Sequence, residues 1–136
     1  MSCFPGIFAS LPGVSCDRFT DSNLNADQFF LSHCHTDHMA GLDQLVLKLR
    51  AKNSVKVNHR IYCSRISKAF IVRKFPVLDE RFVRVLEPDE PVTFNVYDKT
   101  RDAMYKLRAT GIPARHCPGS VMFLFEVGLH RAVDEP

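Results

Sequence analysis

Short apolar runs bounded by polar turn residues predict strands in the first half of the chain. Val14–Phe19 and Gln28–Ser32 have the length and composition of buried strands. The second run ends abruptly in a cluster of histidines, as a strand does at a functional loop. Arg60–Cys63 is a third, shorter strand candidate.

Two helices are expected between and after these strands. From Met39 to Lys52 the apolar positions follow the i, i+3, i+4, i+7 spacing of a helix with one buried face. These positions are Leu42, Leu45, Val46 and Leu49. Ser64 can cap a second helix that runs to about Lys74, and Pro76 would help to end it.

The second half of the chain is predicted to consist of strands. Val83–Leu86, Val92–Tyr97 and Tyr105–Ile112 are separated by polar turns and are expected to form a meander. Ser120–Val127 is the most apolar run, and an almost continuous apolar strand predicts that both of its faces are covered. Gly128–Pro136 is polar and shows no strand pattern.

Composition indicates one globular domain. The chain has 136 residues, of which 46% are hydrophobic and 24% charged, and its 11 Phe can fill a core. No tract approaches the roughly 20 apolar residues of a membrane span, and the start lacks the pattern of a signal peptide. The five cysteines form no C-x-x-C pair, so we expect reduced thiols in an intracellular protein with no membrane partner.

The net charge is +3, and the basic residues are unevenly distributed along the chain. From Gln44 to Leu78 the chain has no Asp or Glu. The basic residues of this stretch are Lys48, Arg50, Lys52, Lys56, Arg60, Arg65, Lys68, Arg73 and Lys74. The stretch is either a solvated face or a surface that attracts phosphate. If it attracts phosphate, the candidate contacts are Lys48, Lys52, Lys56, Arg60, Arg65 and Lys68.

The sequence H-x-H-x-D-H at residues 33–38 directly follows a predicted strand. In an extended or tightly turned segment His33 and His35 can point the same way and hold one divalent ion. Asp37 and His38 can then face a second ion beside it. The alternative is a polar loop whose histidines cap the next helix, but half of the six histidines of the chain fall within these six residues.

Mixed imidazole and carboxylate ligands suit zinc, and manganese or iron are also compatible. Two such metals can share a hydroxide and stabilise the charge that develops during hydrolysis. A first metal held by two histidines lacks a third protein ligand, for which His116 is the best candidate, although a lone loop histidine is commonly a surface residue. Asp17 can orient a ligand imidazole or the metal-bound water, or form a surface salt bridge.

A Cys–His nucleophile is a competing possibility. Cys34 and Cys117 each adjoin a proposed ligand. Alternating side chains would aim Cys34 away from its histidine neighbours, and the two-metal grouping accounts for more residues at once.

Four segments, in order, resemble the metallo-β-lactamase fold nucleases of the DNA cross-link repair group. They are Asp17-Arg18-Phe19, FFLSHCHTDHMAGL (Phe29–Leu42), IYCSRISKAF (Ile61–Phe70) and HCPGSVMFLFE (His116–Glu126). The H-x-H-x-D-H element is shared across that whole superfamily of hydrolases. HCPGSVMFLF is specific to its DNA-processing branch.

The resemblance implies an α/β fold, the amino-terminal half of an αββα sandwich with a mixed β-sheet and flanking helices. It implies His33, His35 and His116 as ligands of a first zinc, with Asp37 and His38 on a second metal. Asp17 matches the acidic residue of the first motif, Asp37 is also a possible proton acceptor, and manganese or magnesium can replace zinc.

The implied activity is 5′-phosphate-directed exonuclease and endonuclease cleavage of DNA ends, overhangs and hairpins in the nucleus. The implied processes are non-homologous end joining and cross-link repair, with a DNA-dependent protein kinase and end-joining factors as partners. On this basis we expect residues 1–127 to be a partial metallo-β-lactamase domain, residues 128–136 to be a divergent or truncated tail, and the family's β-CASP domain to be absent.

The chain also departs from the family pattern. The family has a T-G-D-F-R segment, with an Asp that bridges both metals, after the strand that matches Ser120–Val127, and Arg115 stands where a small or neutral residue is usual. We therefore expect a truncated form of the nuclease. The alternatives are a catalytically inactive form that binds DNA or a partner, a β-CASP RNA-processing nuclease, and a small-molecule hydrolase of the glyoxalase kind.

Overall fold

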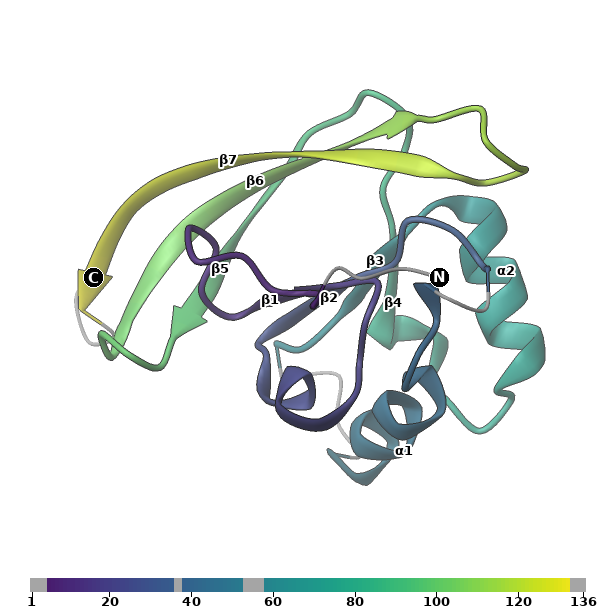
Figure 1. Ribbon diagram of the computed structural model, residues 1–136, viewed down its shortest axis with the longest axis horizontal. Coiled ribbons are helices and arrows are strands. Elements are labelled where there is room, and N and C mark those ends of the chain that lie inside the picture. The colour runs from purple at the N-terminus through teal and green to yellow at the C-terminus, as the bar shows by residue number, and fades with distance from the viewer. Residues whose placement is uncertain (1–4, 36–37, 53–57, 133–136) are drawn as a thin grey trace.

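The computed structural model describes residues 5–35, 38–52 and 58–132, which form three layers (Figure 1). The middle layer is a parallel sheet of β1 (Val14–Cys16), β2 (Gln28–Phe30), β3 (Ile61–Cys63) and β4 (Val83–Val85), in that order. The helices are α1 (Leu42–Lys52) and α2 (Arg65–Lys74), with the short 3-10 helices η1 (Asp21–Asn25) and η3 (Glu80–Phe82). The third layer is an antiparallel sheet of β5 (Val92–Asp98), β6 (Ala103–Pro113) and β7 (Val121–Ala132).

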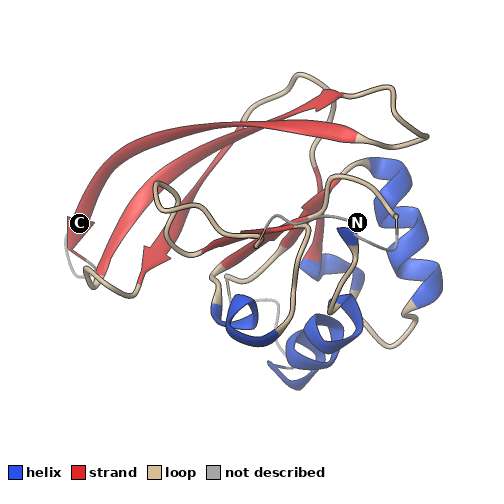
Figure 2. Cartoon of the chain, in the orientation of Figure 1, coloured by secondary structure: helices blue, strands red, loops and turns tan. Residues whose placement is uncertain are grey.

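Alternation along the central strands explains why the layers stack in this way. Successive side chains of a strand point to opposite faces of its sheet. Phe29 and Leu31 therefore pack with the helices, whereas Phe30 between them packs with the antiparallel sheet. The helices lie on one side of the parallel sheet and the long strands arch over the other (Figure 2).

The predicted helices are confirmed, with a small change at the start of the first. All four positions of the expected apolar stripe in α1 are buried. The helix begins at Leu42 rather than near Met39, because Gly41 has a φ of 81°, which is outside the helical region. Ser64 caps α2 as expected, since its hydroxyl accepts a hydrogen bond from the Ser67 amide at 3.2 Å.

Two predictions about the strands are wrong. The stretch around Val83 does not belong to the meander, because β4 pairs with β3 in the parallel sheet and only β5, β6 and β7 form the antiparallel hairpins. β7 also continues past Gly128 as far as Ala132, which is paired with Ala103. The long partner strand β6 supplies the backbone hydrogen bonds there, so pairing rather than apolar pattern extends the strand.

The prediction that both faces of β7 are covered is also wrong for the part of the chain that the structure describes. Phe123 and Phe125 turn inward against Phe30. Met122 and Leu124 on the opposite face are 55% and 48% exposed.

The layers agree with the α/β amino-terminal half of a metallo-β-lactamase sandwich, with parallel and antiparallel strands in two separate sheets. Within the described residues no helix has the length and apolarity to cross a membrane.

Candidate metal centre

The candidate site lies where the parallel strands end. Asp17 follows β1, Ser32 and His33 follow β2, and Ser64 follows β3. Carboxyl ends of parallel strands meet at one edge of a sheet, which is where open α/β sheets bind ligands. The amide of Val121 donates a 2.9 Å hydrogen bond to the Ser32 carbonyl, and this bond brings the start of β7 to the same edge.

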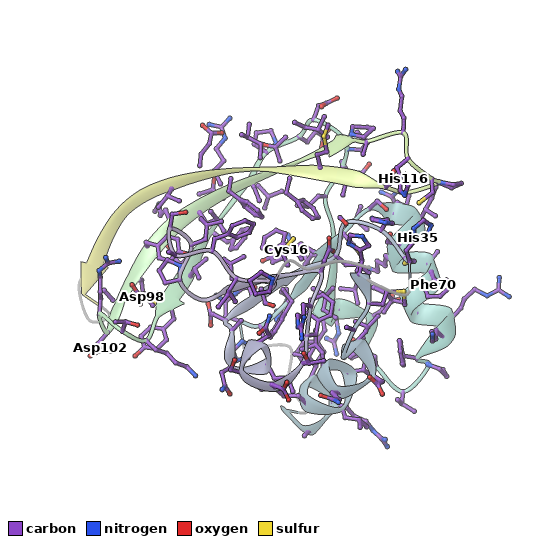
Figure 3. All side chains as sticks on the ribbon, in the orientation of Figure 1. Cys16, His35, Phe70, Asp98, Asp102 and His116 are labelled. Carbon is purple, nitrogen blue, oxygen red and sulfur yellow. The ribbon has the colours of Figure 1, made fainter. Side chains whose placement is uncertain are left out.

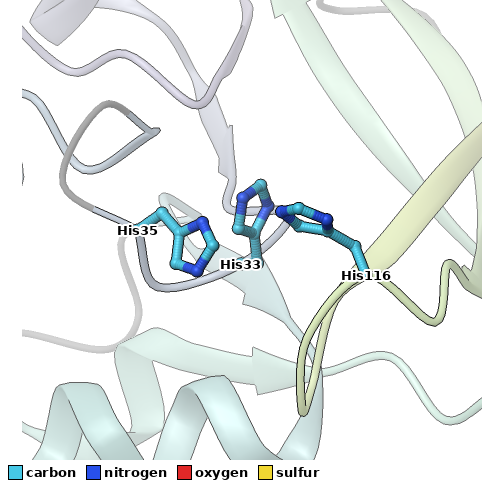
Figure 4. A group of neighbouring side chains, drawn as sticks. All are labelled: His33, His35 and His116. Carbon is cyan, nitrogen blue, oxygen red and sulfur yellow. The ribbon is translucent and has the colours of Figure 1, made fainter. Parts of the chain in front are cut away.

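Three of the predicted metal ligands converge there. The possible ligand atoms of His33, His35 and His116 all lie within 4.8 Å of one another. Their ring centroids are 4.6 Å, 5.1 Å and 5.2 Å apart, and the rings point toward a common centre (Figure 4). Three imidazoles with an open position are the ligand set of a catalytic rather than a structural zinc site.

His33 is the member of this group whose environment fits a metal most directly. It is only 8% exposed, and its Nε2 has no hydrogen-bond partner within the described part of the chain. Burial, followed by the neighbouring His38 and His35, lowers the pKa of His33, which favours the neutral ring that a metal requires. A buried nitrogen without a partner is costly unless something binds it, so the donor set fits a zinc ion.

Asp17 helps to orient the histidines, through Ser32 for His33 and directly for His38. Its carboxylate accepts hydrogen bonds from the Ser32 amide at 2.7 Å and from the Ser32 hydroxyl at 2.6 Å. The same hydroxyl lies 2.9 Å from Nδ1 of His33, and the carboxylate lies 3.0 Å from Nδ1 of His38. Asp17 has a φ of 57°, so the chain turns sharply at this residue and the predicted strand ends at Cys16 instead of Phe19.

The second predicted metal position is only partly visible. Asp37 lies outside the described residues. His38 does not join the three converging histidines among the described residues. Its ring packs 4.1 Å from that of His33, and Asp17 holds its Nδ1. His38 can therefore orient the ring of His33.

The loop that carries His116 is held by a serine that sequence reasoning missed. The Ser120 hydroxyl accepts hydrogen bonds from the amides of His116 at 3.0 Å and Cys117 at 3.1 Å. Ser32 was missed in the same way. Each is a small polar residue close in sequence to a proposed metal ligand. That proximity was the only feature of the sequence that could have indicated their role.

The structure gives no support to a thiol nucleophile at Cys34. This side chain is half-buried and packs against the cluster between the parallel sheet and the helices. Burial raises the pKa of the Cys34 thiol, so the thiolate that would attack a substrate is disfavoured.

The predicted DNA-contacting residues do not form one surface. Arg65 and Lys68 lie on α2, which starts at the edge of the sheet that carries the histidines. Arg60 precedes β3 and is at the opposite edge, with its guanidinium 5.6 Å from the ring centre of Phe82. Lys48 lines a cavity at that same opposite edge and donates to the carbonyl of Leu24. The side chain of Lys52 and the whole of Lys56 lie outside the described part.

The two ends of the molecule therefore differ in chemistry. Figure 3 shows His35 and His116 close together at one end, with Asp98 and Asp102 of the β5–β6 turn at the far end. Asp98 is 1% exposed and accepts hydrogen bonds from the amides of Thr100 and Arg101, so this carboxylate stabilises a turn.

Comparison with known proteins agrees with this geometry, although no family model matches the chain. The chain is 41% identical over 128 residues to protein artemis of Gallus gallus, which covers 93% of this chain and 18% of the relative. The figures for protein artemis of Homo sapiens are the same. The 5′ exonuclease Apollo of Mus musculus is 34% identical over 102 residues, or 75% of this chain and 16% of the relative.

The fold and the histidine group define a chain of the metallo-β-lactamase type with a candidate metal centre at the strand ends. On sequence similarity it belongs to the family that contains artemis and Apollo. The chain spans less than a fifth of the length of these relatives.

The role of Asp17 can be tested by the substitution Asp17→Asn. We expect a roughly 10- to 100-fold loss of zinc affinity, the usual effect of losing a partner that orients a metal ligand. The amide keeps the shape of the side chain but cannot supply the charged acceptor for Ser32 and His38. Competition with a chelating dye measures the affinity. Asp27→Asn, at the opposite edge beside His59, is the matched control, and equal losses in both variants would contradict a positioning role.

Proposed function

We propose that this chain supplies the histidine part of the active site of a zinc-dependent DNA nuclease. The observation that carries the proposal is the convergence of His33, His35 and His116, with a buried Nε2 of His33 that has no partner in the described residues. The family relationship supports phosphodiester hydrolysis as the reaction, because one relative is named a 5′ exonuclease.

Each residue has its own role in the proposed site. The three histidines would hold the metal, which, when bound, supplies a Lewis acid and a water acidic enough to lose its proton near neutral pH. Asp17 and Ser32 fix the ring of His33 in one orientation, and Asp17 also fixes His38. Ser120 fixes the backbone from which His116 projects.

The substrate side of the proposal is DNA with 5′-phosphate ends, overhangs or hairpins. Helix α2 supports it, since its charged residues Arg65, Lys68, Arg73 and Lys74 are all basic and the helix starts at the edge of the metal centre.

We place the activity in the nucleus, in end joining and cross-link repair. Partners would include a DNA-dependent protein kinase and end-joining factors. Asp37 and His38 remain the proposed ligands of a second metal.

The test combines metal analysis with cleavage. The purified protein is expected to contain zinc by mass spectrometry and to cleave a 5′-phosphorylated DNA overhang. His35→Ala, which removes an exposed ligand, should reduce both, while His59→Ala should change neither. Protein that takes up no zinc would overturn the proposal. Zinc binding without cleavage would favour the alternative of a non-catalytic chain that binds DNA.

A further inference from the structure

An apolar cavity of about 470 Å³ lies beside the metal centre. It is bounded by the start of α2, by the chain that follows β4 and by the loop between β6 and β7. The walls are largely apolar and are formed by Ile66, Leu86, Pro88, Pro113 and Val121. Ile66 is 56% exposed, so its side chain is available to a ligand.

The cavity and the metal centre share one loop. Cys117, Gly119 and Ser120 line the cavity, and His116 of the same loop belongs to the metal group. The loop is fixed against α2, because the Ser64 hydroxyl donates a 2.6 Å hydrogen bond to the Gly119 carbonyl. Gly119 has a φ of 82°, and a Cβ there would come within 2.8 Å of Cβ of Ile66. A ligand held in the cavity would therefore have a defined position relative to the histidines.

The rim of the cavity carries more positive than negative groups. Arg115 is exposed and lines the cavity, and Arg65 lines it beside its ion-pair partner Glu87. Arg65 also lines a second cavity along α2, together with Lys68, Arg73 and the acidic Glu80. Positive groups thus outnumber acidic ones from the mouth of the apolar cavity along the helix, and such an excess attracts a phosphate backbone.

We infer that this cavity holds an unpaired nucleobase of a DNA strand whose phosphodiester lies at the metal centre. The inference rests on the proposed function and adds to it the part of the substrate that is recognised. A nucleobase is flat, has apolar faces and is attached to phosphates, so it matches apolar walls with a rim of net positive charge. The planar guanidinium of Arg115 can stack on a base and also attract its phosphate.

The largely apolar wall surface of the cavity determines what kind of recognition it can provide. Reading one base against another requires hydrogen-bond partners along the base edge, whereas apolar contact accepts any base. The site is therefore selective for unpaired over paired nucleotides and tolerant of sequence.

Fluorescence anisotropy with the 136-residue protein tests the inference without cleavage. The probe is a 5′-phosphorylated, single-stranded oligothymidylate in which one nucleotide at a time is replaced by an abasic analogue. We expect one position at which the missing base weakens binding roughly 5- to 150-fold, the range that corresponds to the loss of a stacked base. Ile66→Ser should remove most of this dependence. Phe70→Ser, which removes another exposed apolar side chain of α2 outside the cavity, should keep it.

The outcomes separate this inference from the proposed function. Base dependence that persists in Ile66→Ser, or no sensitive position at all, would overturn the inference even if the protein cleaves DNA. Base-dependent binding with no cleavage would support the cavity assignment and count against the proposed nuclease. Binding confined to an RNA oligomer would overturn the assignment to DNA.

Discussion

Replacement of His33 by alanine is expected to lower the zinc affinity of the protein by more than about a hundredfold. Loss of a partner that merely orients a ligand already costs about 10- to 100-fold, and His33 is itself a proposed ligand. It is the buried member of the group, and its Nε2 has no hydrogen-bond partner in the described structure. His35 and His116 alone would leave the metal with two protein ligands among the described residues.

The effect of this substitution on stability should be small and can be measured separately. In the metal-free protein His33→Ala removes a buried polar atom that lacks a partner, which offsets part of the lost packing. Zinc titration and thermal unfolding of the same samples therefore distinguish a lost ligand from a damaged fold. His59→Ala is the control, because His59 contacts Asp27 at the opposite edge of the sheet. Unchanged zinc affinity in His33→Ala would remove this residue from the site.

Replacement of Phe30 by alanine is expected to destabilise the protein by about 3–5 kcal/mol, the usual cost of deleting a buried phenylalanine. Phe30 is fully buried between the two sheets. Its ring centre lies 4.8 Å from that of Tyr62, 5.3 Å from that of Phe123 and 4.9 Å from that of Phe125. The substitution removes contacts to both sheets at once, and the rings around it cannot all move inward.

Urea unfolding followed by circular dichroism measures this loss. Phe70→Ala is the matched control, since this phenylalanine is 40% exposed on α2 and its loss should cost less than about 1 kcal/mol. A similar small loss for Phe30→Ala would show that the antiparallel sheet does not pack on the parallel sheet as described. The arrangement matters for the site, because the β6–β7 loop brings His116 to the histidines that follow β2.

Much of the local structure could be predicted from the sequence. The helical stripe of α1, the Ser64 cap and the short buried strands follow from side-chain periodicity and from hydrogen bonding within a few residues. The proximity of His33 and His35 could be predicted for the same reason, since the two residues need only a suitable loop to face one point. The need for a third ligand suggested His116, and the position of Asp17 at the end of a predicted strand suggested an orienting role; motif similarity then supported both residues.

The pairing of strands could not be predicted, because it depends on partners far along the chain. The apolar pattern at Val83 is the same whether the strand joins a meander or the parallel sheet. The strand beyond Gly128 has no apolar pattern of its own, and it exists because β6 offers hydrogen-bonding partners. β1 stops before Asp17 and α1 begins after Gly41, because both residues have positive φ angles. Packing imposes these backbone angles.

The sequence by itself determined which residues are able to bind a metal and that they occur in loops after strands. Only the tertiary structure decided that the ligand atoms of His33, His35 and His116 come within 4.8 Å of one another. It also decided that Arg65 lines a cavity beside the loop of His116, whereas Lys48 and Arg60 lie at the opposite edge of the sheet. The physical reason is that ligand chemistry belongs to each side chain, whereas proximity between distant segments is created by the packing of the sheets and helices around their shared cores.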